Sequence, residues 1–189
     1  MAKKLQYVNC RGDVYFVRCV EGKKGKRYVC SKKENATDLT FFPDGYEFSE
    51  NPNGIVSFRR KLNSLITPEE MKLAEELVAE LAAPDLVKFE KKEDAIIVYS
   101  HKRHPDLSAF MGITTRSQEE VQNMLSNLVR YEPVLKFDLL EEKGKRQFVA
   151  YRMTWRGDCD WMFLSMGSLR ALIKKYTPHI EKESFFDLL

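Results

Sequence analysis

The chain of 189 residues carries 31 Lys and Arg against 28 Asp and Glu, and 12% of its residues are aromatic. This composition is typical of a folded protein and argues against a disordered chain. No apolar run approaches the roughly 20 residues that a membrane-spanning helix needs. The basic residues at the N-terminus are not followed by the apolar stretch of a secretory signal. We therefore expect a cytoplasmic protein with no membrane partner.

The positive charge is concentrated in the first third of the chain. Residues 1–66 hold 13 Lys and Arg against 7 Asp and Glu, whereas residues 67–189 hold 18 against 21. The four cysteines form no CxxC pair, which argues against a zinc ribbon. Neither GxGxxG nor GxxxxGK[ST] occurs, so the common nucleotide-phosphate loops are missing. We predict no cofactor.

The first third reads as two β-hairpins. Residues 14–20 and 27–31 are rich in β-branched and aromatic side chains and flank a glycine-containing basic turn. Residues 46–49 and 55–59 flank a turn with Asn53-Gly54, a dipeptide that supplies the positive φ of tight hairpins. Because a lone hairpin is marginal, we expect the two to pair into one small sheet. Residues 1–66 thus form a basic β-hairpin unit.

A helix begins after this unit. Thr67-Pro68-Glu69-Glu70 has the pattern of a capping box with Pro in the first turn. Apolar residues then recur at helical spacing up to Pro84, which ends the helix. We place a domain or subdomain boundary before this helix, at about Ile66, and assign residues 67–189 to an α+β unit. One continuous domain remains the alternative.

The remaining elements predict an α+β fold of antiparallel hairpins with three main helices. Strands are expected at 86–89, 95–99 and 161–164, and a third hairpin at 134–141 and 146–155. Two further helices are expected at 117–129, capped by Ser117, and at 168–176. The alternation of Val149, Tyr151, Met153 and Trp155 predicts that these side chains face the core.

Two stretches carry a resemblance to a known family. The first is Gly45-Tyr46-Glu47 with Glu50-Asn51-Pro52-Asn53-Gly54 and Arg59-Arg60, and the second is the tail Pro178-His179 with Glu183-Ser184-Phe185-Phe186. Together they resemble an uncharacterised family of bacterial proteins. The resemblance implies no activity, ligand or site residue.

Three sets of residues are candidates for chemistry. His101 and His104, three residues apart, form a metal site if His179 joins them, and the competing interpretation is a solvated loop. Asp158 and Asp160 are a candidate pair for Mg²⁺ or acid–base catalysis, and the competing interpretation is a polar turn. Asp138 is a third acid if the fold brings it near. Cys19 and Cys30 face each other across the first hairpin if its register allows, and buried thiols are the simpler interpretation.

The basic hairpin is the strongest functional lead. Its cationic residues are Lys23, Lys24, Lys26, Arg27, Lys32 and Lys33. Lysines neutralise phosphates, and exposed aromatic rings on the same strands would stack on bases. The competing interpretation is a solvated edge that lysines keep from aggregating.

The sequence therefore leaves three functions open. The preferred hypothesis is a non-catalytic binding protein with a protein partner. The alternative is nucleic-acid binding through hairpin 23–33. The third is a metal-dependent enzyme that uses Asp158 and Asp160.

Overall fold

The computed structural model describes residues 4–22, 25–82, 87–101, 129–142, 144–154 and 160–188. The chain divides into two compact units, Met1–Leu62 and Asn63–Leu189. In both units the strands pair antiparallel, as the hairpins of the sequence predict. No helix within the described part of the chain is long and apolar enough to cross a membrane.

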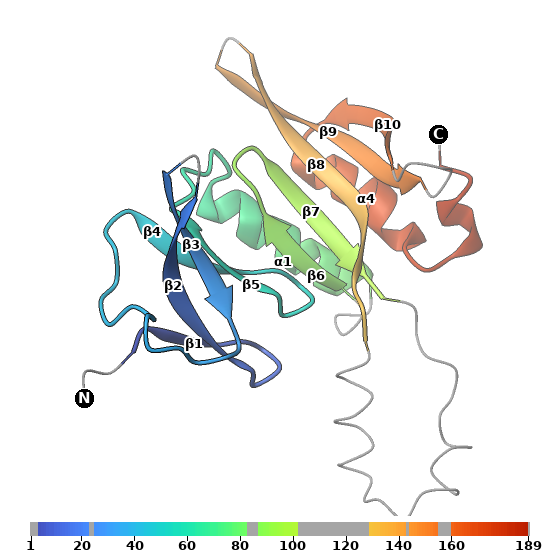
Figure 1. The fold of residues 1–189 in the computed structure, drawn as a ribbon. Coiled ribbons are helices and arrows are strands. Elements are labelled where there is room, and N and C mark those ends of the chain that lie inside the picture. Colours follow the sequence, from blue (N-terminus) through green and yellow to red (C-terminus); the bar gives the residue numbers. More distant parts are fainter. Residues whose placement is uncertain are drawn as a thin grey trace, which may run out of the picture. The chain divides into compact units, whose positions relative to one another are not determined.

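The first unit holds two separate small sheets, and the prediction of one sheet was wrong. Strands β1 (Gln6–Val8), β2 (Val14–Gly22) and β3 (Gly25–Ser31) form one, and β4 (Tyr46–Glu50) and β5 (Val56–Arg60) form the other (Figure 1). The short strand β1 takes the free edge of β2. The second hairpin instead packs aromatic rings against the first, so side chains and not backbone hydrogen bonds join the two sheets.

Phe58 is the centre of this aromatic packing. Its ring lies 4.9 Å from Phe48, 5.4 Å from Phe42 and 5.6 Å from Tyr28, measured between centroids. Edge-to-face pairs of this kind contribute about 0.5–1.5 kcal/mol beyond burial of their area. They give a small unit with few aliphatic core residues a defined centre.

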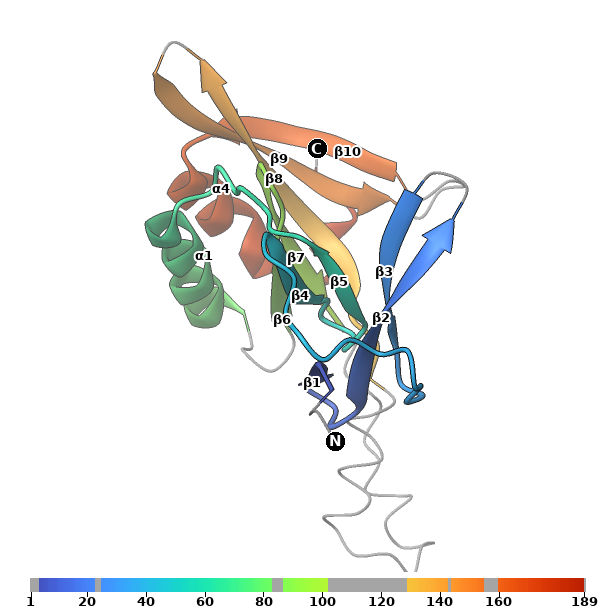
Figure 2. The ribbon, with the colours of Figure 1, turned by 60° about the vertical axis from the view of Figure 1, so that its left-hand side comes forward.

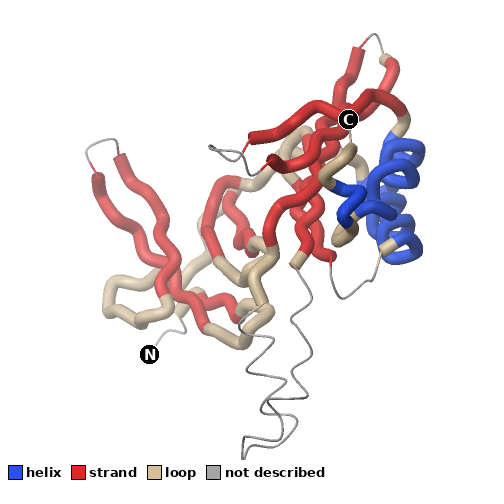
Figure 3. Tube along the Cα trace, turned by 90° about the vertical axis from the view of Figure 1, so that its right-hand side faces the viewer, coloured by secondary structure: helices blue, strands red, loops and turns tan. Residues whose placement is uncertain are grey.

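In its described residues, the second unit consists of a five-stranded sheet and two α-helices. Its elements are α1 (Pro68–Leu81), β6 (Val87–Lys91), β7 (Ala95–Ser100), β8 (Glu132–Glu142), β9 (Lys145–Thr154), β10 (Asp160–Gly167), α4 (Leu169–Tyr176) and the 3₁₀ turns η2 (Thr177–His179) and η3 (Glu183–Phe185). The strand order is β10-β9-β8-β7-β6, so β10 and β6 are the edges. Both helices lie on one face of this sheet (Figures 2 and 3).

The described residues contain two α-helices, and not the three that the sequence predicts. The capping box is confirmed: Thr67 Oγ1 accepts from the Glu70 N–H, and the Glu70 carboxylate accepts from the Thr67 N–H. Ser168 caps α4 through the Ala171 N–H. Residues 117–128 of the helix predicted at 117–129 lie outside the described residues.

The face of β9 that packs under the helices is the opposite of the predicted one. Phe148 and Ala150 are buried in the core, whereas Val149 and Tyr151 are half-buried on the other face. Met153 is buried on that other face but is not part of the main core, and Trp155 lies outside the described residues. Since side chains alternate along a strand, a shift by one residue exchanges the whole set. Both faces of β9 carry apolar residues, so its sequence does not identify the one that the helices cover.

Candidate docking surface

The basic hairpin carries partly neutralised charge in the structure. Lys32 Nζ lies 2.7 Å from an Asp13 carboxylate oxygen, which lowers the pKa of Asp13 and raises that of Lys32. Lys26 lies 3.5 Å from Glu21 across the strand pair. Arg27 and Lys33 are exposed, and no ion pair involves them in the described ranges. Lys23 and Lys24 lie outside the described residues.

Two aromatic residues of the hairpin, Tyr15 and Tyr28, already make contacts within the unit. The Tyr28 ring packs edge-on against Tyr46 at 4.7 Å and against Phe58 at 5.6 Å. Lys32 Nζ lies 5.6 Å from the centroid of the Tyr15 ring. The predicted stacking of bases on these rings would have to displace contacts that the fold already makes.

The cysteines of this hairpin do not face each other. Cys19 pairs with Tyr28, and Cys30 pairs with Val17, so the two thiols are diagonal and not opposite. Both are free thiols. Burial raises the pKa of the Cys30 thiol to about 11, so Cys30 stays protonated and is a poor nucleophile near neutral pH.

The histidines are separated in the structure. The His101 ring packs edge-on against Tyr131 at 4.9 Å. His179 Nδ1 lies 2.9 Å from Ser184 Oγ, within the C-terminal turns. His104 lies outside the described residues. Among the residues that are described, no group of three or more His, Cys, Asp or Glu side chains has the arrangement of a metal site.

The acid pair remains a prediction, because Asp158 lies outside the described residues. Asp160 is exposed, and its carboxylate accepts from the N–H of the next residue, Trp161. Asp138 is not its neighbour. Asp138 pairs with Val149 and Asp160 with Thr154, so they are five positions apart along β9, or about 17 Å.

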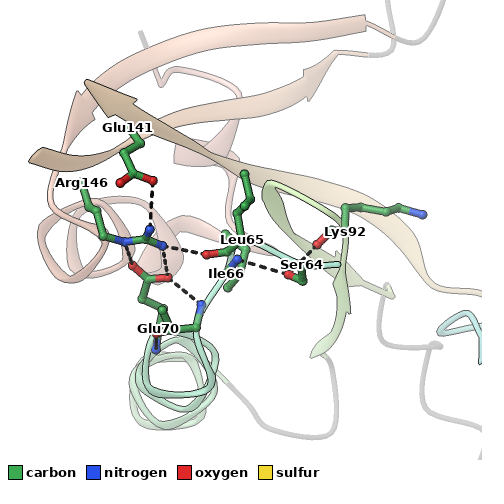
Figure 4. Close-up of polar contacts among 8 residues, drawn as sticks. Ser64, Leu65, Ile66, Glu70, Lys92, Glu141 and Arg146 are labelled. Carbon is green, nitrogen blue, oxygen red and sulfur yellow. Dashed lines mark hydrogen bonds and ion pairs between the residues drawn. The ribbon is translucent and has the colours of Figure 1, made fainter. Parts of the chain in front are cut away.

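A polar network ties the start of α1 to the hairpin of β8 and β9 (Figure 4). Arg146 on β9 donates to both carboxylate oxygens of Glu70, at 2.9 and 2.8 Å, and to the Leu65 carbonyl at 2.8 Å. Glu141 on β8 lies 3.4 Å from the same guanidinium. The Glu70 carboxylate therefore serves the helix cap and Arg146 together. Because Glu70 and Arg146 bind each other and backbone groups of the fold, we assign this network a structural role.

The sheet face opposite the helices carries an apolar surface along β9 and β10. Phe163 and Met166 on β10 pair with Tyr151 and Val149 on β9, all on this outer face. The side chains of Phe163 and Met166 are 59% and 53% exposed. We call the group of Tyr151, Trp161, Phe163 and Met166 the β10 patch.

A β-bulge creates this arrangement. The register of β10 against β9 shifts between Phe163 and Ser165, and Leu164 turns into the core, 6% exposed. A bulge shifts the alternation of side chains by one residue. Phe163 and Met166 therefore share the outer face although they are three residues apart, while Ser165 contacts the Tyr176 hydroxyl on the core side at 2.7 Å.

The charge beside the β10 patch is balanced. Lys136 Nζ on β8 lies 4.6 Å from the centroid of the Tyr151 ring and 5.3 Å from that of Trp161. The same ammonium forms an ion pair with Asp138 at 2.7 Å. Lys136 thus contacts two aromatic rings through cation–π interactions, and Asp138 balances its charge.

The other half of the outer face is polar. Tyr99 on β7 donates to Glu90 on β6 at 2.6 Å, and burial together with this carboxylate raises the pKa of Tyr99. Glu90 also forms an ion pair with Lys92. Lys88 Nζ lies 4.5 Å above the Tyr131 ring. The exposed large apolar side chains of this face therefore lie on β10, with Phe163 and Met166, and at the end of β8, with Leu140.

Comparison with known proteins gives no relative: no family model, curated protein or solved structure matches the chain. Sequence reasoning missed the β10 patch, because Phe163 and Met166 are not two apart and do not follow strand alternation. The bulge can be recognised only when the register of β10 against β9 is known.

Proposed function

We propose that the chain is a non-catalytic binding protein that docks a protein partner on the β10 patch. The observation that carries the proposal is the exposure of two large apolar side chains, Phe163 and Met166, on the same face of β10. Exposure of large apolar side chains to water is unfavourable relative to their burial. A group of them on one face therefore marks an interaction site. Trp, Tyr, Phe and Met are also the residue types enriched in protein interfaces.

The charges favour a protein over a nucleic acid at this surface. A polyanion needs cations that are free to neutralise phosphates. Lys136 is held by Asp138 at 2.7 Å, so it offers little charge to a phosphate. An apolar centre beside the ion pair of Lys136 and Asp138 instead fits the anatomy of a protein interface.

The experiment compares capture of proteins from an extract of the source cells. The bait chains are the wild type, Phe163→Lys/Met166→Lys, and Ile55→Lys as a control, since Ile55 is 62% exposed in the first unit. Washing at about 1 M salt, where the Debye length is about 3 Å, removes charge-driven contacts. We expect a protein that the wild type and Ile55→Lys retain and the double variant loses. Equal capture by all three folded baits would refute the proposal.

Nucleic-acid binding by the hairpin is the second candidate. It is favoured by Arg27 and Lys33, which are exposed on or just after β3 and carry no ion pair within the described part of the chain. Fluorescence anisotropy of labelled single- and double-stranded DNA and RNA across a salt series tests it. Binding should weaken log-linearly with salt and be lost in Arg27→Ser/Lys33→Ser. Flat anisotropy at low salt would exclude this candidate.

A further inference from the structure

The two edges of the five-stranded sheet differ in how they meet solvent. Strand β6, Val87–Lys91, has three charged residues among five. Strand β10, Asp160–Gly167, has one charged residue, at its first position. Charges on an edge strand oppose pairing with another chain, and an apolar edge without them invites it.

The free edge of β10 is a template for another strand. Within the described residues β10 has β9 as its one neighbour, so the backbone groups on its other side are left without a strand partner. Burial of the exposed Phe163 and Met166 side chains on the same strand would accompany any pairing there. Backbone hydrogen bonds and apolar contact thus act at one place, as in recognition by β-strand addition.

We infer that the partner docked at β10 is a second copy of this chain, paired antiparallel through β10 to give a continuous ten-stranded sheet. The inference rests on the proposed function of the β10 patch. The side chains of β10 match their own copy across a two-fold axis, which favours a copy over an unrelated strand. The position of its one charged residue favours the antiparallel direction.

The side chains of β10 match their own copy. In an antiparallel pair about a two-fold axis, if residue i of one copy lies opposite residue j of the other, then j of the first lies opposite i of the second. The sum of the two residue numbers is the same for every opposed pair. The bulge places Phe163 and Met166 on the same face. A register that sets Phe163 of one copy opposite Met166 of the other forms two Phe–Met contacts on that face, one on each side of the axis. Both bulges then meet at the axis, and the regular ends of the strands flank it.

The charge of β10 selects the antiparallel direction. Asp160 is the one charged residue of the strand and stands at its end. Antiparallel pairing separates the two copies of Asp160 by about 27 Å, the length of eight extended residues. Parallel pairing would place the two carboxylates side by side in the same edge, where like charges destabilise the pair.

Sedimentation equilibrium of the full chain over a concentration series tests the inference. We expect a monomer–dimer equilibrium for the wild type and for Ile55→Lys. Phe163→Lys and Met166→Glu should each raise the dimer dissociation constant at least about thirtyfold, as loss of an interface hot spot does. Circular dichroism at each temperature of measurement shows that the variants are folded.

Mixing the two variants tests the register. A mixed dimer of Phe163→Lys with Met166→Glu has one opposite-charge pair and one native Phe–Met pair, so an equimolar mixture should recover dimers that neither variant forms alone. Dimers of both variants with wild-type affinity would overturn the inference, as would a mixture that stays monomeric while the wild type dimerises. A monomeric wild type with patch-dependent capture of another protein would overturn it and leave the proposed function standing. A monomeric wild type with no patch-dependent capture would overturn both.

Discussion

The pair of Arg146 and Glu70 is the contact whose energetic consequence the structure defines most sharply. Arg146→Ala removes a bidentate ion pair and leaves the Leu65 carbonyl without its guanidinium donor. The Glu70 side chain is 18% exposed and that of Arg146 32%, so the pair lies between a surface bridge and a buried one. Surface pairs contribute about 0.2–1 kcal/mol, and breaking a buried pair costs about 3–5 kcal/mol. We therefore expect Arg146→Ala to lower the free energy of unfolding by about 2 kcal/mol.

A double-mutant cycle separates the pair from its surroundings. Glu70→Ala also removes half of the capping box, so its own cost includes the helix start. The coupling energy between Arg146→Ala and Glu70→Ala should be about 1–2 kcal/mol, because both changes disrupt the same charge-assisted hydrogen bonds. Urea unfolding followed by tryptophan fluorescence measures it, since Trp155 and Trp161 both belong to the second unit.

The coupling should also depend on pH. Burial raises the pKa of Glu70, but hydrogen bonds from Arg146 and from the Thr67 backbone outweigh it and hold the pKa below the ordinary value of 4.5. A carboxyl whose pKa is lowered on folding contributes stability above its unfolded pKa and loses it as the pH falls through the folded value. The coupling should therefore be full at pH 7 and shrink below about pH 4.5. A coupling below about 0.3 kcal/mol at pH 7, or one that does not change down to pH 2, would refute this reasoning.

Three further changes test the packing. Gly54→Ala should destabilise the first unit by about 1–3 kcal/mol, measured by near-UV circular dichroism of its tyrosines, because φ is +75° and a Cβ would lie 3.1 Å from a side-chain nitrogen; an unchanged midpoint would contradict this. Phe137→Ala in the core should cost about 3–5 kcal/mol, whereas Phe163→Ala on the exposed face should cost less than about 1 kcal/mol. Similar costs in urea unfolding would show that the faces are assigned wrongly. Thr67→Ala should cost about 1 kcal/mol through loss of the cap, and Thr67→Ser should restore most of it.

The local elements could be read from the sequence because short-range chemistry specifies them. Thr67 and Glu70 are three residues apart and form their capping box within one turn of α1. The Asn51–Gly54 turn likewise closes on itself, with the Asn51 side chain accepting from the N–H groups of Asn53 and Ile55. In both places the residues that cap or turn the chain lie beside the backbone groups that they satisfy.

What only the tertiary structure decided are the choices between equivalent surfaces. Val149 and Phe148 are both apolar neighbours on β9, and the helices that cover one face determine which of them is buried. Arg146 and Glu70 are 76 residues apart in the chain, so nothing local pairs them. The β10 patch depends on a bulge that is defined only against the register of β9. Which face of a strand is buried, which ion pairs it forms and which side chains stay exposed depend on the elements packed beside it. The sequence of the strand alone does not determine them.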